Sequence, residues 1–303
     1  MKQVALLLLL AFLSACASGP KAAAFVSLNE LQPLPTATPS PLPLRVAMAS
    51  VISPQGTVES YALLLDYLAQ KLNRPVELVQ RRTYLEVNDL IKHGEVDLAF
   101  VCTSAYIVGH DDFGMELLVA PQVNGQTVYQ AYLIVPASSV ARDVADLRGK
   151  VFAFTDPISL TGRAYPTWLI QSLGSTPETF FGRTFFTYSH DKAIYAVANG
   201  LADGASVDSL VYDFALARDP SLATRVKVIH RSPPFGIPPV VVNPGLRPQV
   251  KAELRDLLLN MHRDPQGQVA LAAIGVERFV TIGSEAYRSV RAIMDAISLP
   301  PLP

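Results

Sequence analysis

Short apolar runs alternate with amphipathic helical segments along most of this 303-residue chain, and this alternation strongly constrains its fold. It predicts βαβ units, in which helices flank a sheet of mainly parallel strands. Because the alternation occurs in two successive series, we expect an α/β protein with two lobes. The predicted strands lie at residues 44–49, 75–79, 96–101, 151–154, 184–187, 204–207, 226–230 and 237–242, and two further apolar runs lie at residues 117–121 and 129–135.

The chain is expected to pass between the lobes twice, near Pro136 and near Pro238. Lobe 1 then comprises residues 45–136 and 238–303, and lobe 2 comprises residues 137–237. The helical pattern at the C-terminal end is expected to return to lobe 1. Two hinge segments between two lobes are typical of a clamp that closes on a ligand in the cleft.

The first 16 residues have the pattern of a targeting segment. Lys2 precedes an apolar stretch, residues 5–12, that is too short to span a bilayer. Leu13-Ser14-Ala15-Cys16 follows and resembles the bacterial lipobox, in which the cysteine is lipidated and becomes the first residue of the mature protein. A plain signal peptide with a chance cysteine is the alternative. We expect a lipoprotein signal peptide over residues 1–16, with Cys16 as the lipidated residue.

A proline-rich segment, residues 17–44, separates this signal from the first predicted strand. Prolines interspersed with serine and threonine are typical of an extended tether rather than of a packed domain. The chain has two cysteines, so lipidation of Cys16 would leave Cys102 without a disulfide partner. The lipobox and tether together predict an extracytoplasmic protein that is anchored to the cell membrane.

Composition and side-chain spacing exclude several classes of function. The net charge of −1 argues against a nucleic-acid partner, which would require a basic surface. The histidines lack metal-ligand spacing. Ser189 and His190 are adjacent, but neighbouring side chains on a helix point apart and the chain has no G-x-S-x-G elbow. We therefore expect no enzymatic activity.

Residues 156–166 lie where a predicted strand, Val151 to Phe154, leads into a helix. Ser159, Thr161 and Gly162 fall in this junction. The first turn of a helix has backbone N–H groups without internal partners and carries the positive end of the helix dipole. Hydroxyl groups at such a point indicate an anion site. The alternative is an ordinary helix cap formed by Ser159.

Four blocks of sequence resemble the family of substrate-binding proteins for phosphate, phosphite and phosphonate ABC importers. The resemblance extends from about residue 44 to about residue 238, and the blocks occur in the family's order behind a lipobox. The blocks are Gly94 to Phe100 with Ser104-Ala105-Tyr106, Asp156 to Pro166, Ser189 to Asp203, and Val207-Asp208-Ser209.

The resemblance implies a type II periplasmic-binding-protein fold that has no catalysis and no cofactor and holds a small oxyanion between its lobes. The implied partners are an ABC permease and, through the lipid anchor, the membrane; we expect a monomer. Asp208 would face the organic substituent of the ligand, such as an amine. The remaining candidate ligand-binding residues are Ser159, Thr161, Gly162 and His190 in lobe 2, and Tyr61, Tyr84, Ser104 and Tyr106 in lobe 1.

Two departures from the family pattern leave the ligand open. Cys102-Thr103 replaces a small turn that contains glycine, and Arg163 stands where an apolar or aromatic residue is expected. Arg163 would either pair with a dianion or be solvated. Two alternatives also stay open: a clamp that signals to a membrane partner instead of serving import, and a different anion, such as a sulfonate or carboxylate.

Overall fold

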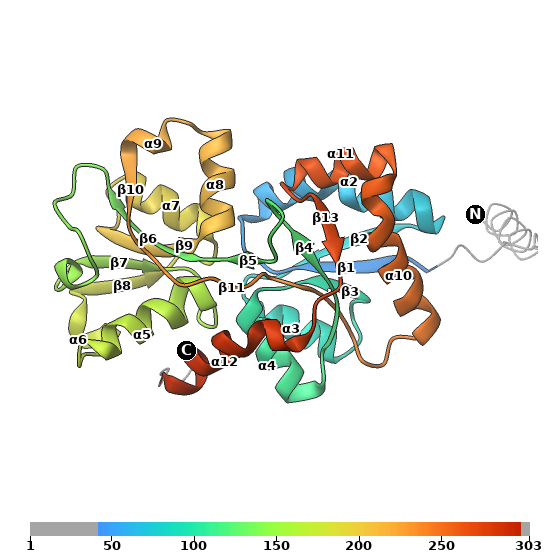
Figure 1. Ribbon diagram of the computed structural model, residues 1–303, viewed down its shortest axis with the longest axis horizontal. Coiled ribbons are helices and arrows are strands. Elements are labelled where there is room, and N and C mark those ends of the chain that lie inside the picture. The colour runs from blue at the N-terminus through green and yellow to red at the C-terminus, as the bar shows by residue number, and fades with distance from the viewer. Residues whose placement is uncertain (1–41, 298–303) are drawn as a thin grey trace, which may run out of the picture. The chain divides into compact units, whose positions relative to one another are not determined.

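Two separate β-sheets, each flanked by helices, make up residues 42–297, the part of the chain that this computed structural model describes (Figure 1). The two-lobe α/β fold predicted from the sequence is therefore confirmed. The predicted signal peptide and most of the predicted tether, residues 1–41, lie outside the described residues, and Leu44 already begins the first strand.

The six-stranded sheet of lobe 1 has the order β13-β4-β12-β3-β1-β2. Its strands are β1 (Leu44–Met48), β2 (Val76–Gln80), β3 (Leu98–Phe100), β4 (Glu116–Gln122), β12 (Val240–Val242) and β13 (Arg278–Val280). Its helices are α2 (Pro54–Leu72), α3 (Tyr84–Lys92), α4 (Thr103–Phe113), α10 (Pro248–Asn260), α11 (Pro265–Ala273) and α12 (Arg288–Ala296), with short 3₁₀ turns at Met261–Arg263 and Ser284–Tyr287.

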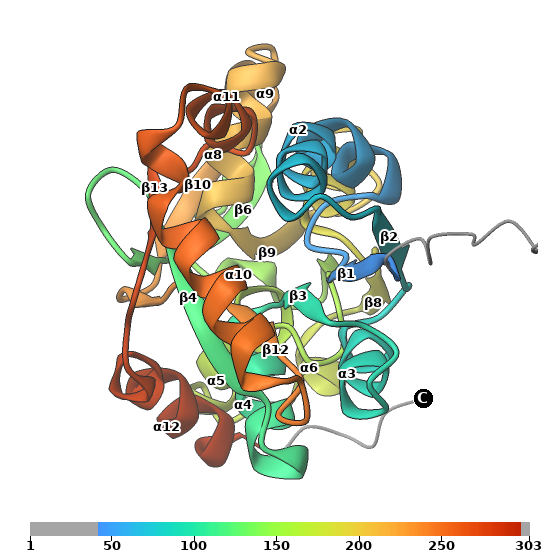
Figure 2. The same cartoon turned by 90° about the vertical axis from the view of Figure 1, so that its right-hand side faces the viewer.

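The alternation of side chains along β1 explains how this sheet is covered on both faces. Leu44, Val46 and Met48 pack with α2, α10 and α11, whereas Ala47 belongs to the cluster formed with α3 and α4. Figure 2 shows α2 and α11 on one side of the lobe and α3 and α4 on the other.

The five-stranded sheet of lobe 2 has the order β10-β6-β9-β7-β8. Its strands are β6 (Ala131–Pro136), β7 (Val151–Phe154), β8 (Arg183–Phe186), β9 (Gly204–Asp208) and β10 (Val226–Arg231). Its helices are a 3₁₀ turn at Ala145–Leu147, the π-helix η3 (Leu160–Ala164), α5 (Tyr165–Ser172), α6 (Pro177–Phe180), α7 (His190–Ala198), α8 (Ser209–Arg218) and α9 (Leu222–Arg225).

A two-stranded ribbon joins the lobes, in which β5 (Val128–Tyr129) pairs antiparallel with β11 (Phe235–Gly236). The first crossing therefore lies at β5, and its predicted position near Pro136 is wrong. The reason is that β6, which ends at Pro136, pairs with β9 and β10 and so belongs to lobe 2. The second crossing passes through β11, close to the predicted position at Pro238.

Both sheets are mixed rather than mainly parallel. β1 pairs parallel with its neighbours, and so does β7, but β12 and β6 run antiparallel to the strands beside them. β12 and β6 are the strands by which the chain enters each lobe from the hinge. Val240 lies opposite Phe100 at the end of β3, and Ala131 lies opposite Asp208 at the end of β9. The entering strands thus begin where the parallel strands end, at the edge that faces the other lobe.

Candidate functional site

The sequence-predicted candidates collect at the carboxyl ends of strands, where each strand leads into a helix. Ser104 lies in the first turn of α4 just after β3, Thr161 lies in η3 after β7, and Asp208 ends β9 and caps α8. Ligands of open α/β sheets bind in the crevice outside these strand ends. In this chain the strand ends of the two lobes face each other, so one ligand can contact both lobes.

The lobes are in direct contact around these residues. Four hydrogen bonds join them: Tyr84 N to Asp156 Oδ2 at 3.0 Å, His190 N to the Val51 carbonyl at 2.9 Å, Ser53 N to Asp191 Oδ1 at 2.9 Å, and Ser104 Oγ to the Ile158 carbonyl. Ser104 therefore contributes a contact between the lobes in this conformation. The clamp is closed.

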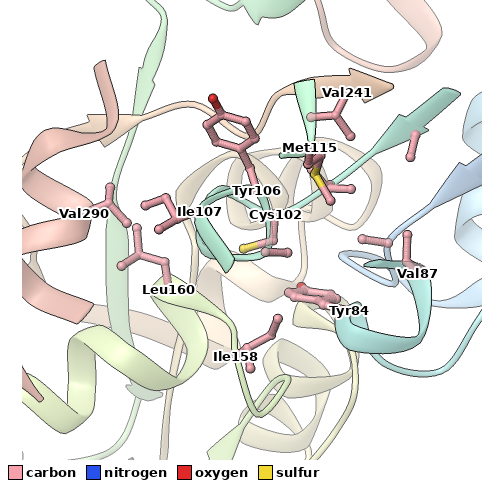
Figure 3. Close-up of a cluster of buried hydrophobic side chains, with 14 of the residues drawn as sticks. Tyr84, Val87, Cys102, Tyr106, Ile107, Met115, Ile158, Leu160, Val241 and Val290 are labelled. Carbon is pink, nitrogen blue, oxygen red and sulfur yellow. The ribbon is translucent and has the colours of Figure 1, made fainter. Parts of the chain in front are cut away.

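One apolar cluster continues across the contact. Figure 3 shows Tyr84 and Cys102 of lobe 1 next to Ile158 and Leu160 of lobe 2, and all four belong to the same buried core. Burial raises the pKa of the Cys102 thiol. Cys102 therefore forms part of the wall of the site as a buried, protonated thiol.

His190 is a neutral hydrogen-bond donor. Its Nδ1 accepts the backbone N–H of Asp208 at 3.0 Å, so the ring proton must be on Nε2. Burial lowers the pKa of His190 to about 3. The imidazole therefore presents a neutral Nε2–H at neutral pH, which can donate to an oxyanion without bringing a positive charge.

Asp208 is both a helix cap and a buried acceptor. Its Oδ1 accepts the backbone N–H groups of Leu210 at 2.7 Å and Val211 at 3.3 Å. Burial raises the pKa of this carboxyl and the two hydrogen bonds lower it. The effect of burial is larger, so the pKa is about 7. The carboxyl can therefore be protonated or ionised near neutral pH, according to what lies opposite it.

Five buried hydroxyl groups near the contact between the lobes have no hydrogen-bond partner within residues 42–297. They belong to Tyr84, Tyr129, Thr155, Thr161 and Ser189. Thr161 and Tyr84 were predicted as ligand-binding residues, whereas Tyr129, Thr155 and Ser189 were not. Thr155 and Ser189 could have been suspected because Thr155 directly follows β7 and Ser189 directly precedes α7. Tyr129 lies in the hinge ribbon, and nothing in its local sequence distinguishes it.

Electrostatic interactions connect the two tyrosines, Tyr84 and Tyr129, with other side chains of the site. Burial raises the pKa of both hydroxyls well above the usual value, and interactions with Cys102 and Asp208 raise each pKa further. Tyr84 also interacts with Asp156 and with Tyr129 itself. The tyrosines therefore remain protonated donors at any physiological pH.

Ser159 and Gly162 shape the turn between β7 and α5. Ser159 Oγ accepts the Gly162 N–H at 3.1 Å, so the expected helix cap is present. A Cβ atom at Gly162 would lie 1.8 Å from Thr155 Oγ1, so the close packing of the turn on β7 requires glycine. The turn is a π-helix, a geometry often found at functional sites.

Two of the sequence-predicted tyrosines lie outside the group of unpartnered hydroxyls. The Tyr106 ring packs against Tyr287, with ring centroids 5.0 Å apart, and its hydroxyl points away from Tyr84 (Figure 3). Tyr61 packs edge-on against Phe100, and burial, with a smaller contribution from Asp208, raises its pKa to about 12. Tyr61 is therefore close to the site, whereas Tyr106 faces another part of lobe 1.

Arg163 follows neither sequence-based expectation. It is buried, its guanidinium lies 4.2 Å from the Phe154 ring centroid, and its Nη2 lies 3.5 Å from Glu178 Oε1. It is thus neither solvated nor among the unpartnered donors. Cation–π contacts and a nearby carboxylate satisfy it within lobe 2.

Within the described chain, no group of three or more His, Cys, Asp or Glu side chains is arranged to hold a metal ion. None of the helices between residues 42 and 297 is long and apolar enough to cross a membrane.

One family model matches most of the chain. The family model for periplasmic substrate-binding proteins of phosphonate ABC transporters matches residues 46–287. A curated relative, the phosphate-import protein PhnD of Mycolicibacterium smegmatis, is 28% identical over 209 residues. That match covers 65% of this chain and 65% of the relative, so it spans just under two thirds of the relative's length.

Solved structures share the fold at low sequence identity. A binding-protein component of an ABC phosphonate transporter from Pseudomonas aeruginosa has a TM-score of 0.78 at 21% identity, with 83% of this chain and 85% of that chain covered. PhnD1 from Prochlorococcus marinus, in complex with methylphosphonate, has a TM-score of 0.75 at 17% identity, with 84% and 97% covered.

Proposed function

Since this chain belongs to the family of periplasmic substrate-binding proteins of phosphonate ABC transporters, as its motifs indicated, we propose that it captures a phosphoryl oxyanion between its lobes and delivers it to an ABC permease. Proteins of this family bind ligands and are not enzymes, so the expectation of no catalysis is confirmed. The proposed ligand is a phosphonate, phosphite or phosphate.

The observation that carries the proposal is the group of buried hydroxyls without partners. A buried polar group left unsatisfied costs roughly 1–3 kcal/mol, so several of them at one place call for a common partner. A tetrahedral anion offers acceptor oxygens in several directions and can satisfy them together. We assign donor roles to three residues predicted from the sequence, Thr161, His190 and Tyr84. We assign the same role to three hydroxyl groups that the sequence analysis did not predict, those of Tyr129, Thr155 and Ser189.

These donors are all neutral, and hydrogen bonds from neutral donors are sufficient for useful affinity. Hydrogen bonds to a charged partner contribute about 1.5–3 kcal/mol each in a site that excludes water. A micromolar dissociation constant requires about 8 kcal/mol. Four or five such bonds reach this value even after the cost of fixing the ligand and the lobes. Binding therefore does not require Arg163, the buried arginine of η3, which contacts Glu178 and the Phe154 ring instead.

Asp208 is proposed to face the organic substituent of the ligand. It is an acceptor among donors, so it would repel a bare dianion unless a proton or an amine lies opposite it. Its carboxyl interacts with both tyrosines of the group, and its backbone N–H orients His190. This position suits an aminophosphonate.

Membrane attachment is proposed to rest on Cys16, which lies outside the described residues. Several acyl chains hold a protein firmly where one alone would not, because each buried methylene contributes about 0.8 kcal/mol. Cys16→Ser should therefore move the protein from the membrane fraction to the soluble fraction. Unchanged membrane association would contradict the lipobox assignment. We also propose that the protein acts as a monomer.

Calorimetry with a panel of anions tests the binding function. The panel contains phosphate, phosphite, methylphosphonate, aminoethylphosphonate, sulfate and taurine. We expect a phosphorus oxyanion to bind tightest, and Thr161→Ala to weaken it by about 1–3 kcal/mol with little change in the stability of the ligand-free protein.

Thr184→Ala, on the exposed edge strand β8, is the matched control and should bind as wild type. If Thr161→Ala and Ser159→Ala both bind the best ligand as well as wild type, these hydroxyls serve only the local turn. Tightest binding of sulfate or taurine would replace the phosphonate proposal with another anion.

A further inference from the structure

An apolar chamber of about 390 Å³ adjoins the proposed oxyanion site. It lies between lobe 1 and helix α8 of lobe 2, and the hinge residue Ile237 forms part of its wall. The main apolar side chains of the wall are Met48, Phe100, Leu210, Phe214, Ile274 and Phe279. The volume falls within the range of roughly 300–1,000 Å³ that is typical of pockets for organic ligands.

Three residues connect the chamber to the oxyanion donors. Asp208 lines the chamber, and its backbone N–H also binds the His190 imidazole. Val51 lines the chamber, and its carbonyl accepts the first N–H of α7. Val101 lines the chamber, and the next residue is Cys102 in the wall of the site. A ligand with its phosphoryl group at His190 therefore has its substituent directed past Asp208 into the chamber.

The polar groups of the chamber wall lie on α2, at the end of β9, at Asp213 on α8 and at Asn124 between β4 and β5. Tyr61 and Ser60 of α2 and the Asp208 carboxyl all line it. Ser60 is buried, and its hydroxyl has no partner in the described part of the chain. One Asp208 oxygen accepts two backbone N–H groups, while no protein donor to Oδ2 is seen within residues 42–297. The chamber thus offers polar partners near the phosphoryl site, and the rest of its wall is apolar except at Asp213 and Asn124.

We propose that this chamber receives the organic substituent of the ligand, and that among ligands without an amine the preferred one carries a phosphoryl group on an apolar chain several carbons long. This inference rests on the proposed function and extends it. Phosphate, phosphite or methylphosphonate would leave the apolar walls in contact with water. A longer substituent would bury both its own surface and theirs.

A homologous series of ligands measures the effect. Burial of each added methylene should tighten binding by about fourfold, the equivalent of ~0.8 kcal/mol, until the chamber is full. We would measure methyl-, propyl- and hexylphosphonate by calorimetry, with hexyl phosphate alongside to compare a phosphonate with a phosphate ester. We expect hexylphosphonate to bind at least tenfold tighter than methylphosphonate.

Two chamber-filling variants identify where the substituent lies. Ala217→Trp on α8 and Val276→Trp before β13 fill the chamber from opposite walls. In each variant hexylphosphonate should bind less than threefold tighter than methylphosphonate, and methylphosphonate should bind within twofold of its wild-type affinity. Ala223→Trp on α9, outside the chamber, is the matched control and should retain the full gain. Thermal unfolding of each variant confirms that it is folded.

The outcomes separate this inference from the proposed function. If methylphosphonate binds but longer chains bind no tighter, the chamber does not receive the substituent, and the oxyanion site stands. If the gain persists in both filled variants, the chain lies elsewhere and the inference is wrong. If no phosphorus oxyanion binds at all, both the inference and the proposed function fail.

Discussion

His190 and Asp208 set each other's role through a single hydrogen bond. The Asp208 N–H fixes the imidazole proton on Nε2, and burial keeps the pKa of His190 at about 3. Burial also raises the pKa of Asp208 to about 7. Near neutral pH the site therefore changes charge at the carboxyl, not at the imidazole. Asp156, which accepts the Tyr84 N–H between the lobes, is a second carboxyl that changes charge in this range, because burial raises its pKa to about 6. Tyr84, Tyr129 and Cys102 all have raised pKa values and stay protonated.

Asp208→Asn should separate ligands that have an amine from those that do not. An ammonium group opposite the carboxylate loses an ionic partner in the variant, whereas a methyl group loses nothing. Calorimetry should show that aminoethylphosphonate binds at least tenfold more weakly, and methylphosphonate within threefold of wild type. The amide retains a side-chain oxygen that can cap α8, so the fold is maintained. An equal loss for both ligands would mean that Asp208 is a structural cap only.

The pH dependence of the wild-type protein provides an independent test of the same residue. Because the pKa of Asp208 in the folded protein lies above its unfolded value, this carboxyl stabilises the ligand-free fold most at low pH, and the contribution is lost as the pH rises through about 7. An ammonium group holds Asp208 ionised, so aminoethylphosphonate should gain affinity relative to methylphosphonate between pH 5 and pH 8. In Asp208→Asn this gain should shrink to the part that comes from the second ionisation of the two phosphonate groups themselves.

The turn from β7 through η3 into α5 is the element on which the oxyanion donors of lobe 2 depend most. Ser159 caps it, Thr161 supplies a hydroxyl without a partner, and Gly162 lies against Thr155. Thr155 N also donates to the Gly162 carbonyl at 3.3 Å. The π-helix and the end of β7 are thus held face to face, which places the hydroxyls of Thr155 and Thr161 on neighbouring segments.

Gly162→Ala should therefore damage both stability and binding. A methyl group 1.8 Å from Thr155 Oγ1 forces the two segments apart, and such overpacking costs about 1–3 kcal/mol of unfolding free energy. We expect chemical denaturation to show this loss and calorimetry to show at least tenfold weaker phosphonate binding. Gly56→Ala in α2 is the matched control, since its nearest contact is Ser53 Oγ at 3.2 Å and alanine favours a helix. Wild-type affinity in Gly162→Ala would show that the geometry of this turn does not matter for the ligand.

The two lobes together form a clamp whose closed form is held by the protein's own contacts as well as by any ligand. Asp191 accepts the Ser53 N–H, and Asp156 accepts the Tyr84 N–H, each from the opposite lobe. A ligand shifts the equilibrium between open and closed forms only by its differential affinity for them. Contacts between the lobes therefore determine how much of the ligand's binding free energy is needed to close the clamp.

Asp191→Ala should weaken closure without touching the ligand. The variant loses one hydrogen bond between the lobes, which is worth ~0.7–1.4 kcal/mol. The affinity for every ligand should therefore fall by the same factor, roughly 3- to 10-fold. Small-angle X-ray scattering should also show a larger radius of gyration for the ligand-free variant. Asp203→Ala is the matched control, because Asp203 accepts the Val151 N–H at 2.8 Å within lobe 2. If the loss differs between ligands, Asp191 acts on the ligand rather than on closure.

Local sequence was sufficient to predict the strands and helices and the turns that connect them. Strand and helix periodicity depends on neighbouring residues, so the run up to Phe154, the turn at Ser159 to Gly162 and the cap at Asp208 could each be predicted in isolation. The four blocks of motif then indicated the family, and with it the two-lobe fold. The same reasoning identified Thr161, Tyr84 and His190 as candidate donors.

Contacts between distant segments determined the position of the hinge and the composition of the site. These contacts depend on strand pairing, which cannot be predicted from a local sequence pattern. The pairing of β6 with β9 moved the first crossing from Pro136 to β5. The packing of Tyr106 on Tyr287 turned its hydroxyl away, while Tyr129 in the hinge ribbon was left with a buried hydroxyl that has no partner in the described chain. The apolar chamber exists only once α2, α8 and β13 come together, since each contributes a part of its wall that is unremarkable in sequence. Sequence thus determined what each segment becomes, and tertiary structure decided which side chains share a site.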